Sequence, residues 1–427
     1  MSDAVIDLGE LRHGPDGDPL PRPPSARGRR TRSTLLALLV LVGLAASAPT
    51  APREVVTLPA VPGSDALVSD DLFVLVEPLG PAGQRRISAT RLPSGEVAWR
   101  MPLPTEGRYW SVAQQGETLL ATGHEVGADQ REMLTIALDR RTGAYRWQQP
   151  GNAAALRDGN LLLWSAGDDG GVVRAVDSCC GTVRWQMAVA PGVDLTFRDG
   201  EHGVDRLVLS HRNGPTEVRD AVSGIVLARA DLRSPDGGGT VSVQTLGDLL
   251  LIVGGRTPMI TAYGLDDLRQ RWRVPSGDAM YAGDCGVVIC MHTRSDRVRT
   301  IDVATGAPRW EGDRWGWVWP YGGRLLATSA GSGGSGTEDI VVLDPPTGRV
   351  LAELGRWELA YHAFGGPLIG VRRHPGGGLL VARLDVDEGV ARTVDVLPEA
   401  GGECQILDVR LLCRRRDANF GLWRLPN

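Results

Sequence analysis

A turn motif that recurs at nearly regular spacing constrains the fold of this chain more than any other feature. Each copy starts with Asp, ends with Gly four residues later, and in four of six cases carries Thr or Ser before the glycine. The six clear copies are Asp139–Gly143, Asp177–Gly181, Asp220–Gly224, Asp302–Gly306, Asp344–Gly348 and Asp385–Gly389, and weaker copies lie at 92–95 and 264–268. The residue four positions after each turn is often Trp, and these positions lie 38 to 48 residues apart: Trp99, Trp147, Trp185, Ala228, Trp272, Trp310, Ala352 and Thr393. Such a period, filled by short strands, is typical of the blades of a β-propeller.

The segments between the turns have the pattern of short strands, which we call a, b, c and d, with strand a innermost. In the unit that contains Trp272, alternating and β-branched residues predict strands at 240–245, 249–255, 259–264 and 269–274. The turn has a physical basis, because Asp can accept backbone N–H bonds and Gly takes the positive φ that other residues resist. The Trp after the turn is large and flat, so we expect it to pack against the next blade.

The repeated pattern Ala/Val-x-Asp-x-x-Thr-Gly-x-x-x-Trp resembles the pyrroloquinoline-quinone-type propeller repeat. That family contains quinoprotein alcohol dehydrogenases and the non-catalytic outer-membrane assembly lipoprotein of Gram-negative bacteria. The resemblance extends over nearly all of residues 54–427 and implies an all-β propeller. It does not imply one function, because the same fold hosts unrelated tasks.

The number of blades follows less directly from the sequence than the fold. Complete units run from about Ser64 to Pro398, and three further strands follow them. These three lack a fourth strand, which 54–58 could supply by pairing across the closure of the ring and removing an open edge. A literal count gives nine blades. We predict eight, the upper end of the usual range, with seven or nine as alternatives.

The amino-terminal segment predicts export. Residues 1–33 are rich in proline and charge and predict a disordered tail, whose last part carries five arginines and no acid. Thr34–Ala48 is uncharged but shorter as a helix than a hydrocarbon core of roughly 30 Å. A cleavable signal peptide and a transmembrane signal anchor over 34–51 both fit, and we predict the anchor because the leader is long and Pro49 follows the small residues. The arginines would keep the tail in the cytoplasm and place the propeller, 53–427, outside a single-pass cell-membrane protein.

Charge and composition exclude several classes of function. The chain has a formal net charge of −5, which argues against a nucleic-acid partner. All 46 of its Lys and Arg residues are Arg, so mechanisms that need a lysine amine are excluded.

Six cysteines, an even number, suit disulfides in an exported domain. Cys179 and Cys180 are adjacent inside one of the repeat turns, where we expect a structural role; contact with a cofactor is the alternative that the quinoprotein resemblance suggests. Cys404 and Cys413 could face each other across an a–b hairpin. Cys285 and Cys290 do not centre on a turn, so their pairing is less expected.

Histidines and arginines recur where strand b meets strand c, and these positions share one face of a propeller. The histidines are His124, His211, His292 and His374, and the arginines are Arg212, Arg256, Arg294, Arg372, Arg373 and Arg414–Arg416. Arginine forks suit carboxylate or phosphate groups, so an anionic ligand or partner could bind there. A solvated polar rim is the simpler interpretation. We predict no metal site, because loops of alternate blades rarely converge on one ion.

Three tryptophans alternate along one predicted inner strand. Trp315, Trp317 and Trp319 would share one face of that strand, and Tyr321 would continue it. Such a stripe could line the axial channel and stack on a planar ligand. Packing between blades is the interpretation that we favour, and the channel lining is the alternative.

No catalytic motif emerges from the sequence. The recurrent aspartates are explained by the turns, and we predict no catalytic residues and no cofactor. The function that we predict is a non-enzymatic, membrane-anchored extracytoplasmic scaffold that binds a protein, a ligand or a component of the cell envelope through loops on one face. A quinoprotein oxidoreductase and an extracytoplasmic sensor domain are the alternatives.

Overall fold

The structure is a computed structural model that describes residues 55–426 with ten internal gaps: 70, 79–84, 104–106, 126–132, 166–168, 212–213, 233–239, 330–335, 363–365 and 408. The chain divides into two compact units, Met1–Arg53 and Glu54–Asn427. The predicted tail 1–33 and the predicted membrane span 34–51 lie outside the described residues. Within the part that is described, no helix is long and apolar enough to cross a membrane.

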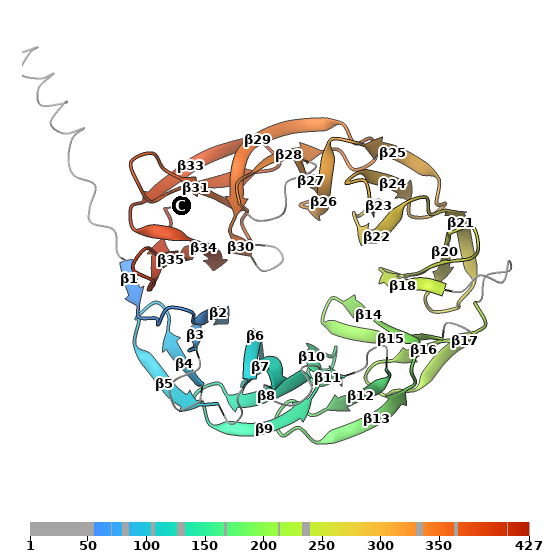
Figure 1. Cartoon of the computed structure of the whole chain (residues 1–427), viewed down its shortest axis with the longest axis horizontal. Helices are drawn as coiled ribbons and strands as arrows, with labels where there is room; N and C mark the ends of the chain where they lie inside the picture. The colour runs from blue at the N-terminus through green and yellow to red at the C-terminus, as the bar shows by residue number, and fades with distance from the viewer. Residues whose placement is uncertain are drawn as a thin grey trace, which may run out of the picture. The chain divides into compact units, whose positions relative to one another are not determined.

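The unit 54–427 consists of largely antiparallel sheets that follow one another around a ring (Figure 1). The first three four-stranded sheets are β2 (Asp65–Ser69), β3 (Leu72–Val76), β4 (Arg86–Arg91) and β5 (Val97–Pro102); β6 (Gly107–Gln115), β7 (Thr118–Glu125), β8 (Met133–Asp139) and β9 (Tyr145–Pro150); and β10 (Asn152–Ala155), β11 (Leu161–Trp164), β12 (Gly171–Val176) and β13 (Val183–Val189). The next three are β14 (Val193–Gly200), β15 (Gly203–His211), β16 (Thr216–Asp220) and β17 (Val226–Ala230); β18 (Thr240–Leu246), β19 (Leu249–Gly254), β20 (Met259–Gly264) and β21 (Gln270–Pro275); and β22 (Ala279–Asp284), β23 (Val288–Thr293), β24 (Val298–Asp302) and β25 (Pro308–Gly312). The prediction of an all-β fold built from four-stranded units is confirmed.

The seventh sheet joins two sequence repeats. It contains β26 (Trp315–Tyr321), β27 (Arg324–Ser329), β28 (Glu338–Leu343), β29 (Val350–Leu359), β31 (Ile369–Arg373), β32 (Leu379–Asp385) and β33 (Val390–Leu397). Most of β29 pairs with β28, but Glu358 and Leu359 at its end pair with β31. One long strand therefore serves two repeats. The described strands form eight sheets but nine repeats, so the prediction of eight blades is not confirmed.

The eighth sheet closes the ring with strands from both ends of the unit. Its order is β1 (Val55–Leu58), β36 (Phe420–Arg424), β35 (Arg410–Arg415), β34 (Ala400–Leu407) and β30 (Tyr361–His362). Residues Val55–Leu58 pair antiparallel with β36, as predicted for 54–58. Leu58 is fully buried in a cluster that includes Phe73, Phe420 and Leu422.

The repeat turns are held by the aspartate side chain, as the motif predicts. In Asp302–Gly306, Asp302 Oδ1 accepts hydrogen bonds from the backbone N–H of Thr305 at 2.8 Å and from its hydroxyl at 2.8 Å. Asp139 makes the same two bonds with Thr142. In Asp302 the hydrogen bond from Arg309 and those from Thr305 lower the carboxyl pKa to about 2, so this acceptor is ionised at neutral pH.

Where a tryptophan follows the turn, it packs on the next repeat, which confirms that prediction. Trp272 Nε1 donates to the carbonyl oxygen of Val303 at 2.9 Å, and a Cβ added at Gly306 would lie 2.7 Å from the Trp272 ring. Gly306 has φ +70°, so both its backbone and the ring above it require glycine. The same bond from indole to carbonyl recurs in the pairs Trp99–Arg140, Trp147–Ser178, Trp185–Val222 and Trp310–Pro345.

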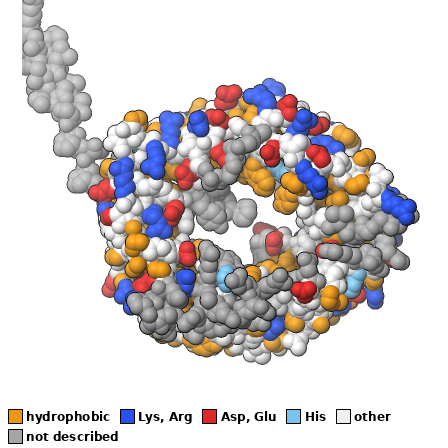
Figure 2. Space-filling model, in the orientation of Figure 1, with side chains coloured by type: hydrophobic (Ala, Val, Ile, Leu, Met, Phe, Trp, Pro, Cys, Tyr) orange, Lys and Arg blue, Asp and Glu red, His pale blue; other side chains and the backbone are white. Residues whose placement is uncertain are grey.

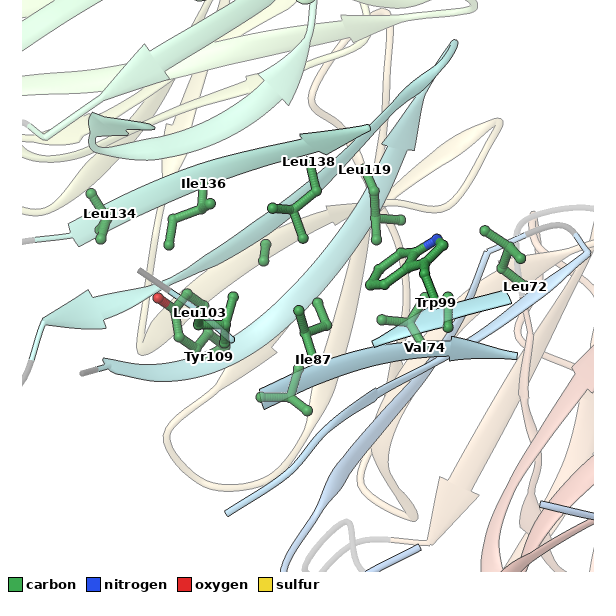
Figure 3. Close-up of a cluster of buried hydrophobic side chains, with 13 residues drawn as sticks. Leu72, Val74, Ile87, Trp99, Leu103, Tyr109, Leu119, Leu134, Ile136 and Leu138 are labelled. Atoms are coloured by element: carbon green, nitrogen blue, oxygen red, sulfur yellow. The ribbon is translucent and has the colours of Figure 1, made fainter. Parts of the chain in front are cut away.

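Apolar clusters fill the spaces between successive sheets. Figure 3 shows the junction of the first two sheets, where Trp99 lies beside Leu72 and Val74 of its own sheet and Leu119 of the next. Indole bonds and shared cores therefore join neighbouring repeats into one scaffold.

All six cysteines are paired. Cys404–Cys413 bridges the hairpin of β34 and β35, as predicted, and Cys179–Cys180 lies within its repeat turn. Cys285 pairs with Cys290 across the hairpin of β22 and β23. The prediction that Cys285 and Cys290 are less suited to pair was wrong. The backbone N–H of Cys285 donates to the carbonyl of Val288, and this tight turn between β22 and β23 brings the two cysteines together.

Candidate functional site

The turns that join strands b and c, with the strand ends beside them, make one face of the ring, which we call the b–c face. His124, His211 and His292 lie on β7, β15 and β23, and His374 lies in the turn between β31 and β32. Arg212 lies outside the described residues. Arg294 is exposed in the turn after β23, and its backbone N–H bonds to the carbonyl of Asp278.

Acidic residues partner several of the arginines on this face. Arg414 pairs with Glu403, and Arg415 pairs with Glu399 and Asp417. The Arg372 guanidinium lies 4.4 Å from the centre of the Trp357 ring. Figure 2 shows acidic and basic side chains intermixed around the ring, so the arginines do not form one continuous basic surface in that view.

The three tryptophans of β26 do not share one face, and that expectation was wrong. The register of β26 against β27 shifts between Trp315 and Trp317, which indicates a β-bulge. Trp315 is buried in the cluster with Cys285 and Cys290, whereas Trp319 packs on the side that includes Trp357. Trp317 is left 52% exposed.

Trp317 belongs to a small group of side chains from two neighbouring repeats. Its ring stacks on the His292 imidazole at a centroid distance of 4.4 Å and lies nearly parallel to the Tyr281 ring at 6.2 Å. Tyr281 is 48% exposed, and Met280 beside it is 58% exposed. We call Met280, Tyr281, His292 and Trp317 the rim aromatic cluster, because β22 and β26 are the innermost strands of their repeats. Figure 2 shows hydrophobic side chains on the inner rim beside these two strands.

His292 forms the buried floor of this cluster. It is 6% exposed, and its Nδ1 atom has no hydrogen-bond partner in the part of the chain that is described. Burial lowers the pKa of the His292 imidazole, although the backbone of Gly316 and Val318 opposes this shift. The imidazole is therefore neutral at pH 7, and it offers a flat apolar face to Trp317.

Polar groups border the cluster on the b–c face. Ser295 Oγ donates to Asp278 Oδ2 at 2.8 Å, next to the exposed Arg294. Protein-binding surfaces commonly have an apolar, aromatic centre and a polar edge, and the rim aromatic cluster with its polar neighbours has this composition.

Sequence reasoning missed Met280 and Tyr281. No local signal was available, because the orientations of Tyr281 and Trp317 depend on a β-bulge that directly precedes each residue near the start of an inner strand. Bulges re-aim side chains, but they depend on the pairing of two strands and cannot be located from one strand alone.

The vicinal cysteines have structural neighbours. Cys179 and Cys180 are exposed in a c–d turn, at the opposite end of the sheet from the b–c turn. The carbonyl of Ser178 accepts the indole N–H of Trp147, and Gly181 lies against the same ring. Among the described residues no group of three His, Cys, Asp or Glu side chains could hold a metal ion.

Comparison with known proteins supports the repeat resemblance. Residues 83–204, less than a third of the chain, match the family model described as outer membrane protein assembly factor BamB. A search of the curated proteins finds no significant match.

Solved structures with similar folds include BamB from Moraxella catarrhalis, with 15% identity and a TM-score of 0.38 over 61% of this chain and 80% of that one. They also include a eukaryotic initiation factor, with 11% identity and a TM-score of 0.53 over 80% of this chain and 90% of that one. At such identities the likeness concerns the fold alone.

Proposed function

We propose that the unit 54–427 is a non-enzymatic, membrane-anchored extracytoplasmic scaffold that binds a protein or ligand through its b–c face. The rim aromatic cluster is the observation that carries this proposal. Tyr281 and Trp317 each leave about half of a large ring in water, at a cost of roughly 25 cal/mol for every Å² of apolar surface that a partner could cover. Aromatic side chains exposed together and bordered by polar groups are typical of interaction sites.

The scaffold around the cluster suits this role. Its side chains come from two repeats whose backbones are held by indole bonds and buried cores, so binding costs little reordering of the backbone. The match of residues 83–204 to the BamB family model supports a role in binding proteins.

Export is supported by the cysteines and the amino terminus. The six cysteines form three disulfides, which persist in oxidising compartments. The uncharged Thr34–Ala48 segment, preceded by arginines, supports an anchor with the propeller outside the cytoplasm.

A titration of the full chain with pyrroloquinoline quinone in the presence of Ca²⁺ tests the non-enzymatic proposal. We expect no heat of binding and no alcohol-dependent dye reduction, since His292 covers one face of the Trp317 ring and leaves only the other face for stacking. The variant Trp317→Ala is the control, because it removes the indole ring on which a bound quinone would stack. Binding at about 1 μM or tighter, worth roughly −8 kcal/mol, with turnover that the variant loses, would establish the oxidoreductase alternative instead.

A further inference from the structure

A polar cavity lies at the closure of the ring, away from the rim aromatic cluster. It measures about 260 Å³ and is lined by residues of the first, second and last repeats: Ser64, Asp65, Ala66, Tyr109, Glu403, Gln405, Arg414 and Phe420. Figure 1 shows β2, β34 and β35, three of the strands that carry them, near β1, which pairs with the last strand, β36. Hydrogen bonds from Gln405 to the carbonyl of Ala66 and from Arg414 to the carbonyl of Ser64 join the repeats there.

One side chain in this cavity is buried without a partner. Ser64 is 2% exposed, and its Oγ makes no hydrogen bond to any described residue. A hydroxyl group removed from water without a partner costs about 1–3 kcal/mol. The Ser64 oxygen is closed off from solvent as it stands, so a ligand in the cavity supplies the missing partner once the side chain turns to a rotamer that faces the cavity. The next residue, Asp65, lines the same cavity and takes part in no ion pair with the described residues.

The positive charge of the cavity is already neutralised. Arg414 Nε donates to Glu403 Oε2 at 2.7 Å, and its guanidinium lies 4.5 Å from the centre of the Phe420 ring. The carboxylate of Asp65 is thus left over, and the lining carries a net charge of −1. Gln405 donates through its amide nitrogen, which leaves its amide oxygen as a further acceptor.

We propose that this cavity binds a primary ammonium group. An ammonium is compact and has three donors, and the cavity offers three acceptors in the Asp65 carboxylate, the Ser64 hydroxyl and the Gln405 amide oxygen. The walls of Tyr109 and Phe420 suit the methylene chain that leads to the ammonium.

The source of the group is a free amine or a lysine of another protein. This chain has no lysine, so none of its own side chains can fill the cavity with an ammonium. The inference goes beyond the proposed scaffold function and does not depend on it, because no residue of the cavity belongs to the rim aromatic cluster.

Calorimetric titration of the full chain tests the proposal with two amine probes, cadaverine and the peptide acetyl-Ala-Lys-Ala-amide. We expect at least one of them to bind with a dissociation constant of about 1 mM or lower. The same peptide with an acetylated lysine should not bind, since acetylation removes the charge. Tighter binding of cadaverine indicates a free amine, and tighter binding of the peptide indicates a partner's lysine.

Matched variants locate the site. Asp65→Asn is expected to weaken binding about tenfold or more, as hydrogen bonds to charged groups are worth about 1.5–3 kcal/mol, and Ser64→Ala about threefold. Asp313→Asn, which changes an exposed aspartate outside the cavity, should leave binding unchanged. A thermal unfolding transition of each variant shows whether it folds. If Asp65→Asn does not fold, Ser64→Ala still tests whether the cavity is the binding site. The proposal is overturned if neither amine binds, if the acetylated peptide binds equally well, or if neither cavity variant weakens binding.

Discussion

Replacement of Trp272 by alanine is expected to lower the free energy of unfolding by about 3–5 kcal/mol. The Trp272 ring is 6% exposed, covers Gly306 of the next repeat and donates its N–H to the carbonyl of Val303. Its removal opens a cavity between two sheets and leaves that carbonyl without its indole donor, and both changes destabilise the fold. Chemical denaturation of the full chain measures the loss.

The control for this variant is the same substitution at an exposed tryptophan. Trp317→Ala removes an indole that is 52% exposed, so we expect a loss below about 1 kcal/mol. If the two substitutions cost the same, packing of the turn tryptophans between repeats is not what stabilises the ring.

Replacement of Leu58 by aspartate should prevent stable folding, at a cost above about 4 kcal/mol. Leu58 is fully buried on β1, which comes from the start of the unit and pairs with β36 at its end. A carboxylate there would lie in an apolar cluster among Phe73, Phe420 and Leu422. The yield of folded protein and its denaturation midpoint measure the effect.

The neighbouring residue gives a matched control. Thr57 is exposed on the same strand, and its hydroxyl accepts a hydrogen bond from Arg415. Thr57→Asp places the same charge on the outward side, next to that arginine, and we expect a change within about 0.5 kcal/mol. Equal tolerance of both substitutions would mean that β1 does not close the ring.

The fold was largely predictable because its signals are local and repeated. Asp302–Gly306 and the other turns bring together an acceptor, a positive φ and a packing tryptophan within nine residues, and each copy supports the others. The pairing of Val55–Leu58 followed from the three strands left over at the carboxyl end. The blade count did not follow, because one strand, β29, runs through two repeats and no residue marks that continuity.

The candidate site was only partly predictable. Trp317 and His292 were singled out from their sequence positions, but their contact depends on a bulge that turns Trp317 away from Trp315. Tyr281 comes from the same repeat as His292, which precedes the repeat of Trp317, and it lies 36 residues before Trp317 in the chain. The cavity at the ring closure unites Ser64 with Arg414, which are 350 residues apart. Such meetings are set by the tertiary fold, so no local pattern predicts them.

The most direct test of the binding proposal is photo-crosslinking from the rim aromatic cluster. A photo-reactive phenylalanine derivative is placed at Trp317 of the full chain in the cells that express it, and in a parallel strain at Tyr145, an outer-strand residue that is 49% exposed. We expect one defined adduct from position 317 and none from position 145, with the adduct reduced by Tyr281→Ala in the same chain. Adducts from position 145 alone, or the same adducts from both positions, would contradict binding through the rim aromatic cluster.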